Sequence, residues 1–188
     1  KSSSSYGRIV TDKHLERLRA YIENAKELNA TIEVGGNVDA SEKYIEPTII
    51  SDLKKKATVL EEEIFGPILP IVTYKTIEEA IDYVNSKERP LALYIYSKDK
   101  SNTKKIINTT RAGGTCINNN IIQYANHYLP FGGVNNSGIG KSHGVFGFEA
   151  FSNKRAVIKQ HTFGVTELLF PPYSSIKETL ARLTIKWF

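Results

Sequence analysis

The chain has 188 residues, 40% of them hydrophobic, with a formal net charge of +5 and a sequence pI near 9.1. This composition can bury a core and excludes a disordered chain. Lysine and arginine are spread among carboxylates along the chain, which argues against a nucleic-acid-binding protein. One cysteine and four scattered histidines exclude a disulfide framework, and they show no metal-ligand spacing.

The chain shows no signal peptide pattern and no apolar run of membrane-spanning length. We therefore expect a protein of the reducing cytoplasm. The sequence starts at Lys1 and contains no methionine, and residues 1–5 are typical of a solvated loop. We therefore also expect a fragment of a longer protein.

The first third of the chain predicts one helix and two extended segments. Apolar residues recur at helical spacing from Thr11 to Asn29, so an amphipathic helix is expected there. Residues 31–34 alternate like a short strand before a glycine turn. Residues 44–50 form a second extended segment, in which Pro47 indicates an edge or a bulge.

The middle of the chain alternates between strand and helix patterns. Residues 68–74 predict a strand, and Thr76 with Glu79 forms a capping box for a helix that ends before Pro90. The apolar run 91–97 predicts a strand buried on both faces. A helix over 101–110 and a strand over 115–118 follow. This order predicts an α/β fold with a mostly parallel sheet and right-handed crossovers.

The last forty residues have a different pattern. Residues 154–159 predict a lone strand, and Phe170-Pro171-Pro172-Tyr173 is a rigid extended break. Ser174 or Ser175 then caps a basic amphipathic helix. Its apolar face carries Ile176, Leu180, Leu183 and Trp187.

Two glycine-containing turns are candidate sites, because glycine allows the backbone to approach a ligand closely. In Glu61–Pro67, the turn at Gly66-Pro67 directs Glu63 and Phe65 to one side of a loop. A carboxylate can accept hydrogen bonds from ribose hydroxyls, and an aromatic ring can pack beside a nicotinamide. From these residues alone, a solvated acidic segment with Phe65 in the core is the favoured interpretation.

The second turn is Leu129–Gly140, with the sequence Leu-Pro-Phe-Gly-Gly-Val-Asn-Asn-Ser-Gly-Ile-Gly. By itself it favours Phe131 as a core residue over a substrate contact. Residues 135–142 end like a P-loop, but the position of the first glycine in that motif is occupied by Asn135. Nucleoside triphosphate binding is therefore not expected.

In this order and spacing the two turns resemble the aldehyde dehydrogenase superfamily. Glu62–Pro67 matches the Glu-Glu-Ile-Phe-Gly-Pro element completely, and 130–140 matches the Pro-Phe-Gly-Gly…Ser-Gly-x-Gly loop. Further segments, at 6–10, 44–48, 88–94, 149–152 and 170–173, are similar to the class 3, fatty aldehyde dehydrogenase-like subfamily. The resemblance covers nearly the whole chain.

The resemblance implies specific roles for three residues. Glu63 would bind the ribose of NAD or NADP, Phe65 would pack against the nicotinamide, and Phe131 would wall the aldehyde pocket. The parent enzyme would oxidise aldehydes to carboxylic acids through a cysteine thiolate and a general-base glutamate. Both catalytic groups are expected before the first residue of this chain, so the isolated chain is expected to be inactive. No metal site is implied.

Cys116 and His127 are the residues most easily mistaken for catalytic groups. Cys116 lies in an apparent buried strand with no cationic neighbour in the sequence, which is typical of a small apolar residue. In the family arrangement it is not the nucleophile. His127 is more typical of a hydrogen-bonding loop residue than of a proton shuttle.

The resemblance also implies a domain organisation. Residues 1–150 would form part of the three-layer catalytic domain, and 151–188 an oligomerisation-type strand with a tail helix. A homodimer is expected of the complete enzyme. The tail helix is too short to span a bilayer (about 20 apolar residues are needed). Packing on its own protein is favoured over binding to a membrane surface.

Two other functional classes stay open. One is a non-catalytic scaffold or interaction module built on a truncated aldehyde dehydrogenase domain. The other is a relative of the acyl-phosphate reductases, which should lack the two motifs that this chain carries.

Overall fold

The computed structural model describes residues 1–160 and 170–187. The chain divides into two compact units, Lys1–Lys87 and Glu88–Phe188. Among the described residues, no helix combines the length and apolar character needed to cross a membrane.

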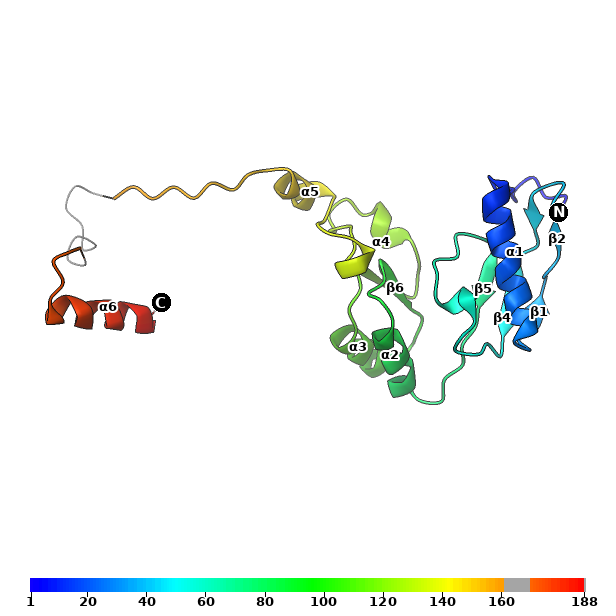
Figure 1. Ribbon diagram of the computed structural model, residues 1–188, viewed down its shortest axis with the longest axis horizontal. Coiled ribbons are helices and arrows are strands. Elements are labelled where there is room, and N and C mark those ends of the chain that lie inside the picture. The colour runs from blue at the N-terminus through cyan, green and yellow to red at the C-terminus, as the bar shows by residue number, and fades with distance from the viewer. Residues whose placement is uncertain (161–169, 188) are drawn as a thin grey trace. The chain divides into compact units, whose positions relative to one another are not determined.

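The first unit contains two α-helices and a small mixed sheet (Figure 1). The sheet has the strand order β1 (Thr31–Val34), β4 (Thr48–Ser51), β5 (Ile68–Pro70), in which β1 and β4 are antiparallel and β4 and β5 are parallel. A separate antiparallel pair, β2 and β3, connects β1 to β4 without a helix. The elements are α1 (Asp12–Glu27), β1 (Thr31–Val34), β2 (Val38–Asp39), β3 (Tyr44–Ile45), β4 (Thr48–Ser51), β5 (Ile68–Pro70) and α2 (Ile77–Ser86), with a 3₁₀ turn at Thr58–Leu60.

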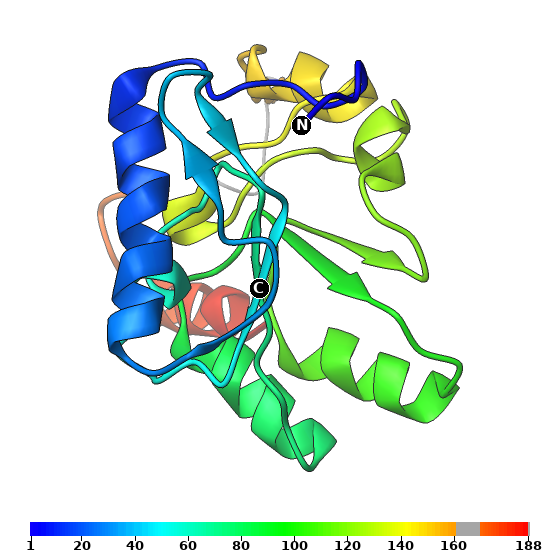
Figure 2. The same cartoon turned by 90° about the vertical axis from the view of Figure 1, so that its right-hand side faces the viewer.

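The core of the first unit is formed by side chains of α1 and of the strands, and both views show this helix beside those strands (Figure 1, Figure 2). Thr11 caps α1 by accepting a hydrogen bond from the His14 backbone N–H. The residues of α1 that are buried recur every three or four positions: Leu15, Leu18, Tyr21, Ile22 and Ala25. They pack with Ile45, Ile50 and Ile68 from the strands.

The second unit is built around a parallel strand pair, β6 and β7. The helix α3 connects these strands, as a parallel crossover requires. Asp99 caps α3 by accepting from the backbone N–H groups of Ser101 and Asn102. The elements are β6 (Ala92–Ile95), α3 (Lys100–Thr109), β7 (Gly114–Ile117), α4 (Ile122–Ala125), α5 (Gly144–Ala150) and α6 (Ser175–Trp187), with a 3₁₀ turn at Asn135–Ser137.

The predicted α/β class is confirmed, and each helix expected between residues 11 and 110 is present. Parallel pairing is found for β4–β5 and β6–β7, whereas β1–β4 and β2–β3 are antiparallel. The tail helix begins at Ser175, and the hydroxyl of Ser174 accepts from the Lys177 backbone N–H, as expected of a cap.

Three expectations about strands need correction. Residues 44–50 form two strands, because the chain is interrupted at Glu46-Pro47. The segment 91–97 is a strand only over Ala92–Ile95, and it is not buried on both faces, since Tyr94 and Tyr96 are exposed. The strand expected over 68–74 covers only Ile68–Pro70. For residues 154–159, which are exposed and form no ladder with any described residue, the oligomerisation-type strand stays a prediction.

Candidate functional site

The loop Glu61–Pro67 connects the 3₁₀ turn at Thr58–Leu60 to β5, and its three glutamates have different surroundings. The Glu61 carboxylate pairs with the Lys87 ammonium at 2.6 Å. The Glu62 carboxylate accepts a hydrogen bond from the Tyr21 hydroxyl at 2.5 Å. For the Glu63 carboxylate no partner is found in the described part of the chain, and this side chain is exposed. One of the three carboxylates is therefore available to a ligand.

Helix α1 holds the backbone of this loop. The Arg17 guanidinium donates to the carbonyl oxygens of Glu63 at 3.1 Å and Ile64 at 2.7 Å, and also to the Tyr21 hydroxyl at 2.8 Å. A Cβ at Gly66 would lie 2.5 Å from the methyl carbons of the buried Leu18, so a larger residue would have to displace this side chain. Two neighbouring residues of α1, the half-buried Arg17 and the buried Leu18, thus hold the loop.

Phe65 is in a conformation that large residues rarely adopt. Its φ is +44° and its side chain is 77% exposed. A left-handed backbone costs a non-glycine residue about 1–2 kcal/mol, and an exposed phenyl ring gains little from burial to offset it. Strained residues of this kind concentrate at binding sites. Glu63 and Phe65 are therefore the two side chains of this loop that are exposed and that make no stabilising contact with the rest of the described chain.

Phe131 lies in the second unit, in an aromatic cluster. Its ring packs against that of Tyr124 in a T-shaped arrangement, at a centroid distance of 4.9 Å with 75° between the planes, and stacks on His143 at 5.5 Å with 22° between the planes. The Phe131 and Ser142 backbones exchange two hydrogen bonds of 3.1 and 2.7 Å. The half-buried ring is held in a defined orientation.

The glycines after Phe131 give this loop its compact shape. A Cβ at Gly133 would overlap the carbonyl group of Ser137. The Ser137 hydroxyl accepts from the Val134 N–H at 2.9 Å and donates to the Val134 carbonyl at 3.0 Å. The glycine and serine residues of the motif thus serve the folding of the loop, and Phe131 is its aromatic side chain.

Cys116 and His127 occupy different positions in the second unit. Cys116 is buried in β7 with 8% of its surface exposed, whereas a reactive thiolate requires access. The His127 ring lies 5.5 Å from that of His143 and therefore belongs to the cluster around Phe131. In the part of the chain that the structure describes, no group of three or more metal-ligating side chains is found.

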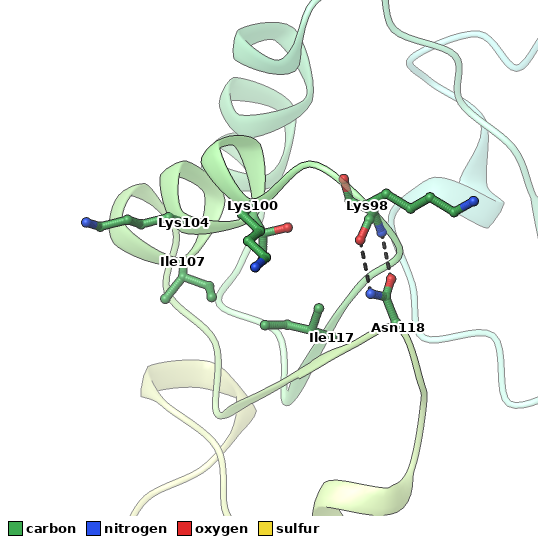
Figure 3. A pocket seen from close by; sticks show the side chains of 8 residues that line it. Lys98, Lys100, Lys104, Ile107, Ile117 and Asn118 are labelled. Atoms are coloured by element: carbon green, nitrogen blue, oxygen red, sulfur yellow. Dashed lines mark hydrogen bonds between the residues drawn. The ribbon is translucent and has the colours of Figure 1, made fainter.

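A pocket of about 520 Å³ lies between α3 and β7 (Figure 3). Its apolar wall is formed by Ile107 and Ile117, and Asn118 closes one end through two hydrogen bonds with the Ser97 backbone. Lys98 and Lys104 extend away from each other at the rim. This pocket contains none of the three predicted site residues.

The predicted residues belong to separate units. Glu63 and Phe65 lie in Lys1–Lys87, and Phe131 lies in Glu88–Phe188.

The model of the Aldehyde dehydrogenase family matches residues 1–157, which is most of the chain. The chain belongs to the aldehyde dehydrogenase family. It is 40% identical over 173 residues to the 4,4'-diaponeurosporen-aldehyde dehydrogenase of Staphylococcus aureus (strain NCTC 8325 / PS 47), covering 92% of this chain and 37% of that protein. It is 41% identical over 179 residues to aldehyde dehydrogenase family 3 member A2 of Rattus norvegicus, covering 94% of this chain and 36% of that protein.

Solved structures of this family have the same fold over the matched residues. The substrate-bound state of Staphylococcus aureus AldH superposes with a TM-score of 0.81 at 37% identity, over 98% of this chain and 39% of that one. The Mycobacterium tuberculosis aldehyde dehydrogenase complexed with NAD⁺ gives a TM-score of 0.75 at 33% identity, over 85% and 33%. The chain thus spans little more than a third of the length of these relatives.

The sequence motifs did not identify the residues that support the two loops. Arg17 and Tyr21 have the spacing of one helix face, and only the fold shows that they reach the glutamate loop. Tyr124 and His143 flank the Phe131 motif, but nothing in their spacing predicts that their rings pack on Phe131. Lys141 directly follows the last glycine of the motif, and its position within the loop's hydrogen bonds was not predicted.

Proposed function

We propose that this chain supplies coenzyme-binding and substrate-pocket residues to an enzyme that oxidises aldehydes to carboxylic acids with NAD or NADP. Membership of the aldehyde dehydrogenase family supports the reaction class. The observation that carries the residue assignment is the contrast among the glutamates: Glu61 and Glu62 bind within the unit, and Glu63 stays exposed beside Phe65.

The exposed pair fits a nicotinamide coenzyme. The Glu63 carboxylate is an acceptor that two adjacent ribose hydroxyls can reach, and a charge-assisted hydrogen bond is about twice as strong as a neutral one. The Phe65 ring offers an apolar face beside which a nicotinamide can pack. The bound coenzyme would supply the hydride acceptor. Arg17, by fixing the carbonyls of Glu63 and Ile64, keeps the carboxylate and the ring in place.

On this proposal Phe131 is a wall of the aldehyde pocket. Its ring stacks on His143 and makes a T-shaped contact with Tyr124, so the orientation it presents is defined before a substrate binds. A preorganised wall reduces the conformational entropy lost on binding.

We propose that the chain by itself does not catalyse the reaction. The chemistry of acyl transfer through a thiol requires an accessible thiolate, and Cys116 is buried in β7. The isolated chain, incubated with an aliphatic aldehyde and NAD⁺ or NADP⁺, should give no sustained absorbance of reduced coenzyme. Steady turnover would contradict this proposal.

The residue assignment can be tested in a chimeric enzyme, in which this chain replaces the matching part of the Staphylococcus aureus 4,4'-diaponeurosporen-aldehyde dehydrogenase. Glu63→Gln should raise the KM for the coenzyme about tenfold, because a charge-assisted hydrogen bond contributes about 1.5 kcal/mol or more. Glu61→Gln is the matched control. It removes an exposed ion pair from the same loop and should leave the KM for the coenzyme unchanged. An equal response of the two variants would refute the assignment of Glu63.

Phe131→Ala in the same enzyme should raise the KM for the aldehyde and leave that for the coenzyme unchanged. A reversed pattern would place Phe131 at the coenzyme and overturn its assignment to the substrate pocket.

We also propose that residues 1–150 are part of the catalytic domain and that 151–188 serve oligomerisation, with a second copy of the chain as the partner. Val157 and Ile158 are 73% and 94% exposed, and their backbone forms no ladder among the described residues. The two-stranded β6–β7 sheet has unpaired edges in the described part of the second unit. An extended apolar segment and a free sheet edge complement each other.

Sedimentation velocity tests this dimer. Val157→Pro removes a backbone donor and should shift the dimer toward monomer, while Val157→Ile keeps the donor and should leave it unchanged. A dimer that is unaffected by the proline would exclude this segment from the interface.

A further inference from the structure

The Lys141 ammonium lies at the centre of three backbone carbonyl groups. It donates hydrogen bonds to the carbonyl oxygens of Gly132 at 2.6 Å, Gly113 at 3.0 Å and Gly133 at 3.0 Å. An ammonium has three donors, and all of them are used here. No carboxylate pairs with Lys141 among the described residues, so the side chain serves the backbone and not an ion pair.

The three carbonyls come from two separate segments. Gly113 immediately precedes β7, and Gly132 and Gly133 follow Phe131. A Cβ at Gly113 would overlap the Gly132 carbonyl, so the two segments touch through backbone atoms. Carbonyl dipoles that converge on one point repel each other, and a cation at that point removes the repulsion. Lys141 supplies this cation from within the chain.

We propose that Lys141 is the positioning residue for Phe131, a role that rests on the proposed function of Phe131 as a pocket wall. The ammonium ties the residues after Phe131 to the start of β7. Lys141 also directly precedes Ser142, whose backbone exchanges two hydrogen bonds with that of Phe131. Lys141 therefore anchors Phe131 in two ways: through the carbonyls of the residues that follow it, and through the neighbouring Ser142, with which Phe131 pairs.

The geometry favours lysine over arginine at this position. Three oxygens from different segments surround a single point, which suits a compact ammonium with three donors. The planar guanidinium fork instead matches two oxygens of one planar group. Lys141→Arg keeps the charge and should restore only part of the effect that Lys141→Met removes.

Amide hydrogen exchange on the full chain tests the anchor without reference to any activity. Lys141→Met should accelerate exchange of the Phe131 and Ser142 amides on the order of tenfold, because the carbonyl anchors of the loop are lost. The β4 amides of the first unit should be unaffected. Lys104→Met is the matched control: this lysine is exposed on α3 and extends away from the molecule, and its removal should leave the loop amides unchanged (Figure 3).

Steady-state kinetics of the chimeric enzyme test the consequence for the substrate. Lys141→Met should raise the KM for the aldehyde several-fold with the KM for the coenzyme unchanged, and Lys141→Arg should fall between it and the wild type. Unchanged exchange at Phe131 and Ser142 would overturn the anchor itself. Faster exchange with an unchanged aldehyde KM would instead refute the pocket role of Phe131, and with it the positioning role.

Discussion

The two units of the chain are stabilised in different ways. In Lys1–Lys87 the buried residues of α1 and of the strands form one continuous apolar cluster. Among the described residues of Glu88–Phe188, the buried apolar side chains are those of Ile95 and Cys116, while Tyr94, Ile117 and Leu129 are exposed. Polar contacts to the backbone, from Asp99 and Lys141, fix the shape of the second unit instead.

This difference bears on how each candidate site is held. The Glu61–Pro67 loop lies on the apolar cluster, so its geometry depends on hydrophobic packing against α1. The Phe131 loop depends on hydrogen bonds among glycine carbonyls, Ser137 and Lys141. Packing of the first kind tolerates few substitutions, whereas hydrogen bonds near solvent can be exchanged for water at lower cost.

The largest expected effect is on the core of the first unit. Leu18→Ala should lower its free energy of unfolding by about 2–5 kcal/mol, because Leu18 is fully buried and supports Gly66. Urea titration followed by circular dichroism measures the loss. Ile117→Ala is the control from the second unit; this side chain is 45% exposed, and its loss should cost less than about 1 kcal/mol. Equal losses would show that the two units do not differ.

The next effect concerns the glycine loop of the second unit. Gly133→Ala would force a methyl group into the Ser137 carbonyl and should cost about 1–3 kcal/mol. Exchange of the Phe131 amide should accelerate accordingly. Gly114→Ala is the control in the same unit, because its Cβ would lie 3.8 Å from the nearest atom. If both alanines are tolerated, backbone packing does not define this loop.

Local patterns in the sequence predicted most of the elements. The spacing of Leu15, Leu18 and Ile22 predicted the buried face of α1. Half of the predicted capping box of α2 forms: the Thr76 hydroxyl accepts from the Glu79 N–H, whereas the Glu79 carboxylate accepts from the Lys75 N–H and not from that of Thr76. These features depend on neighbours within one helical turn. The α/β class followed from the alternation of such elements.

Long-range contacts could not be read from the sequence. The hydrogen bond from Arg17 to the Glu63 carbonyl joins residues 46 positions apart, and that from Lys141 to the Gly113 carbonyl joins residues 28 apart. No local pattern encodes such a pairing. The exposure of Tyr94 was missed for a related reason, since an apolar run is buried only where another element covers it.

A smaller effect is expected at the hydroxyl that links α1 to the glutamate loop. Tyr21→Phe removes the hydrogen bonds to Glu62 and Arg17 and should cost about 1 kcal/mol. Tyr74→Phe, at a 59% exposed position of the same unit, should be neutral. A neutral Tyr21→Phe would mean that packing alone holds the loop.

The same residue predicts a dependence of stability on alkaline pH. Burial, and then the hydrogen bond to the Glu62 carboxylate, raise the pKa of Tyr21 above its usual value. The folded state therefore keeps the phenol proton to a higher pH than the unfolded state does. The stabilisation is complete below about pH 10 and is lost as the pH rises through the folded-state pKa. The urea midpoint should fall there, and Tyr21→Phe should flatten the decline.

The smallest effect, and the only stabilising one, is expected at Phe65. Phe65→Gly relieves the left-handed backbone and should change the free energy of unfolding by about 1 kcal/mol or less, in the stabilising direction. Phe65→Ala retains the strain and should not stabilise. In the chimeric enzyme both variants should raise the KM for the coenzyme, because both remove the ring. A higher free energy of unfolding together with a higher KM for the coenzyme would show that Phe65 lowers the stability of the first unit while it contributes to coenzyme binding. A lower free energy of unfolding in Phe65→Gly would instead mean that the ring stabilises the fold. Phe65 could then no longer be described as an exposed side chain that the packed core of the first unit does not need.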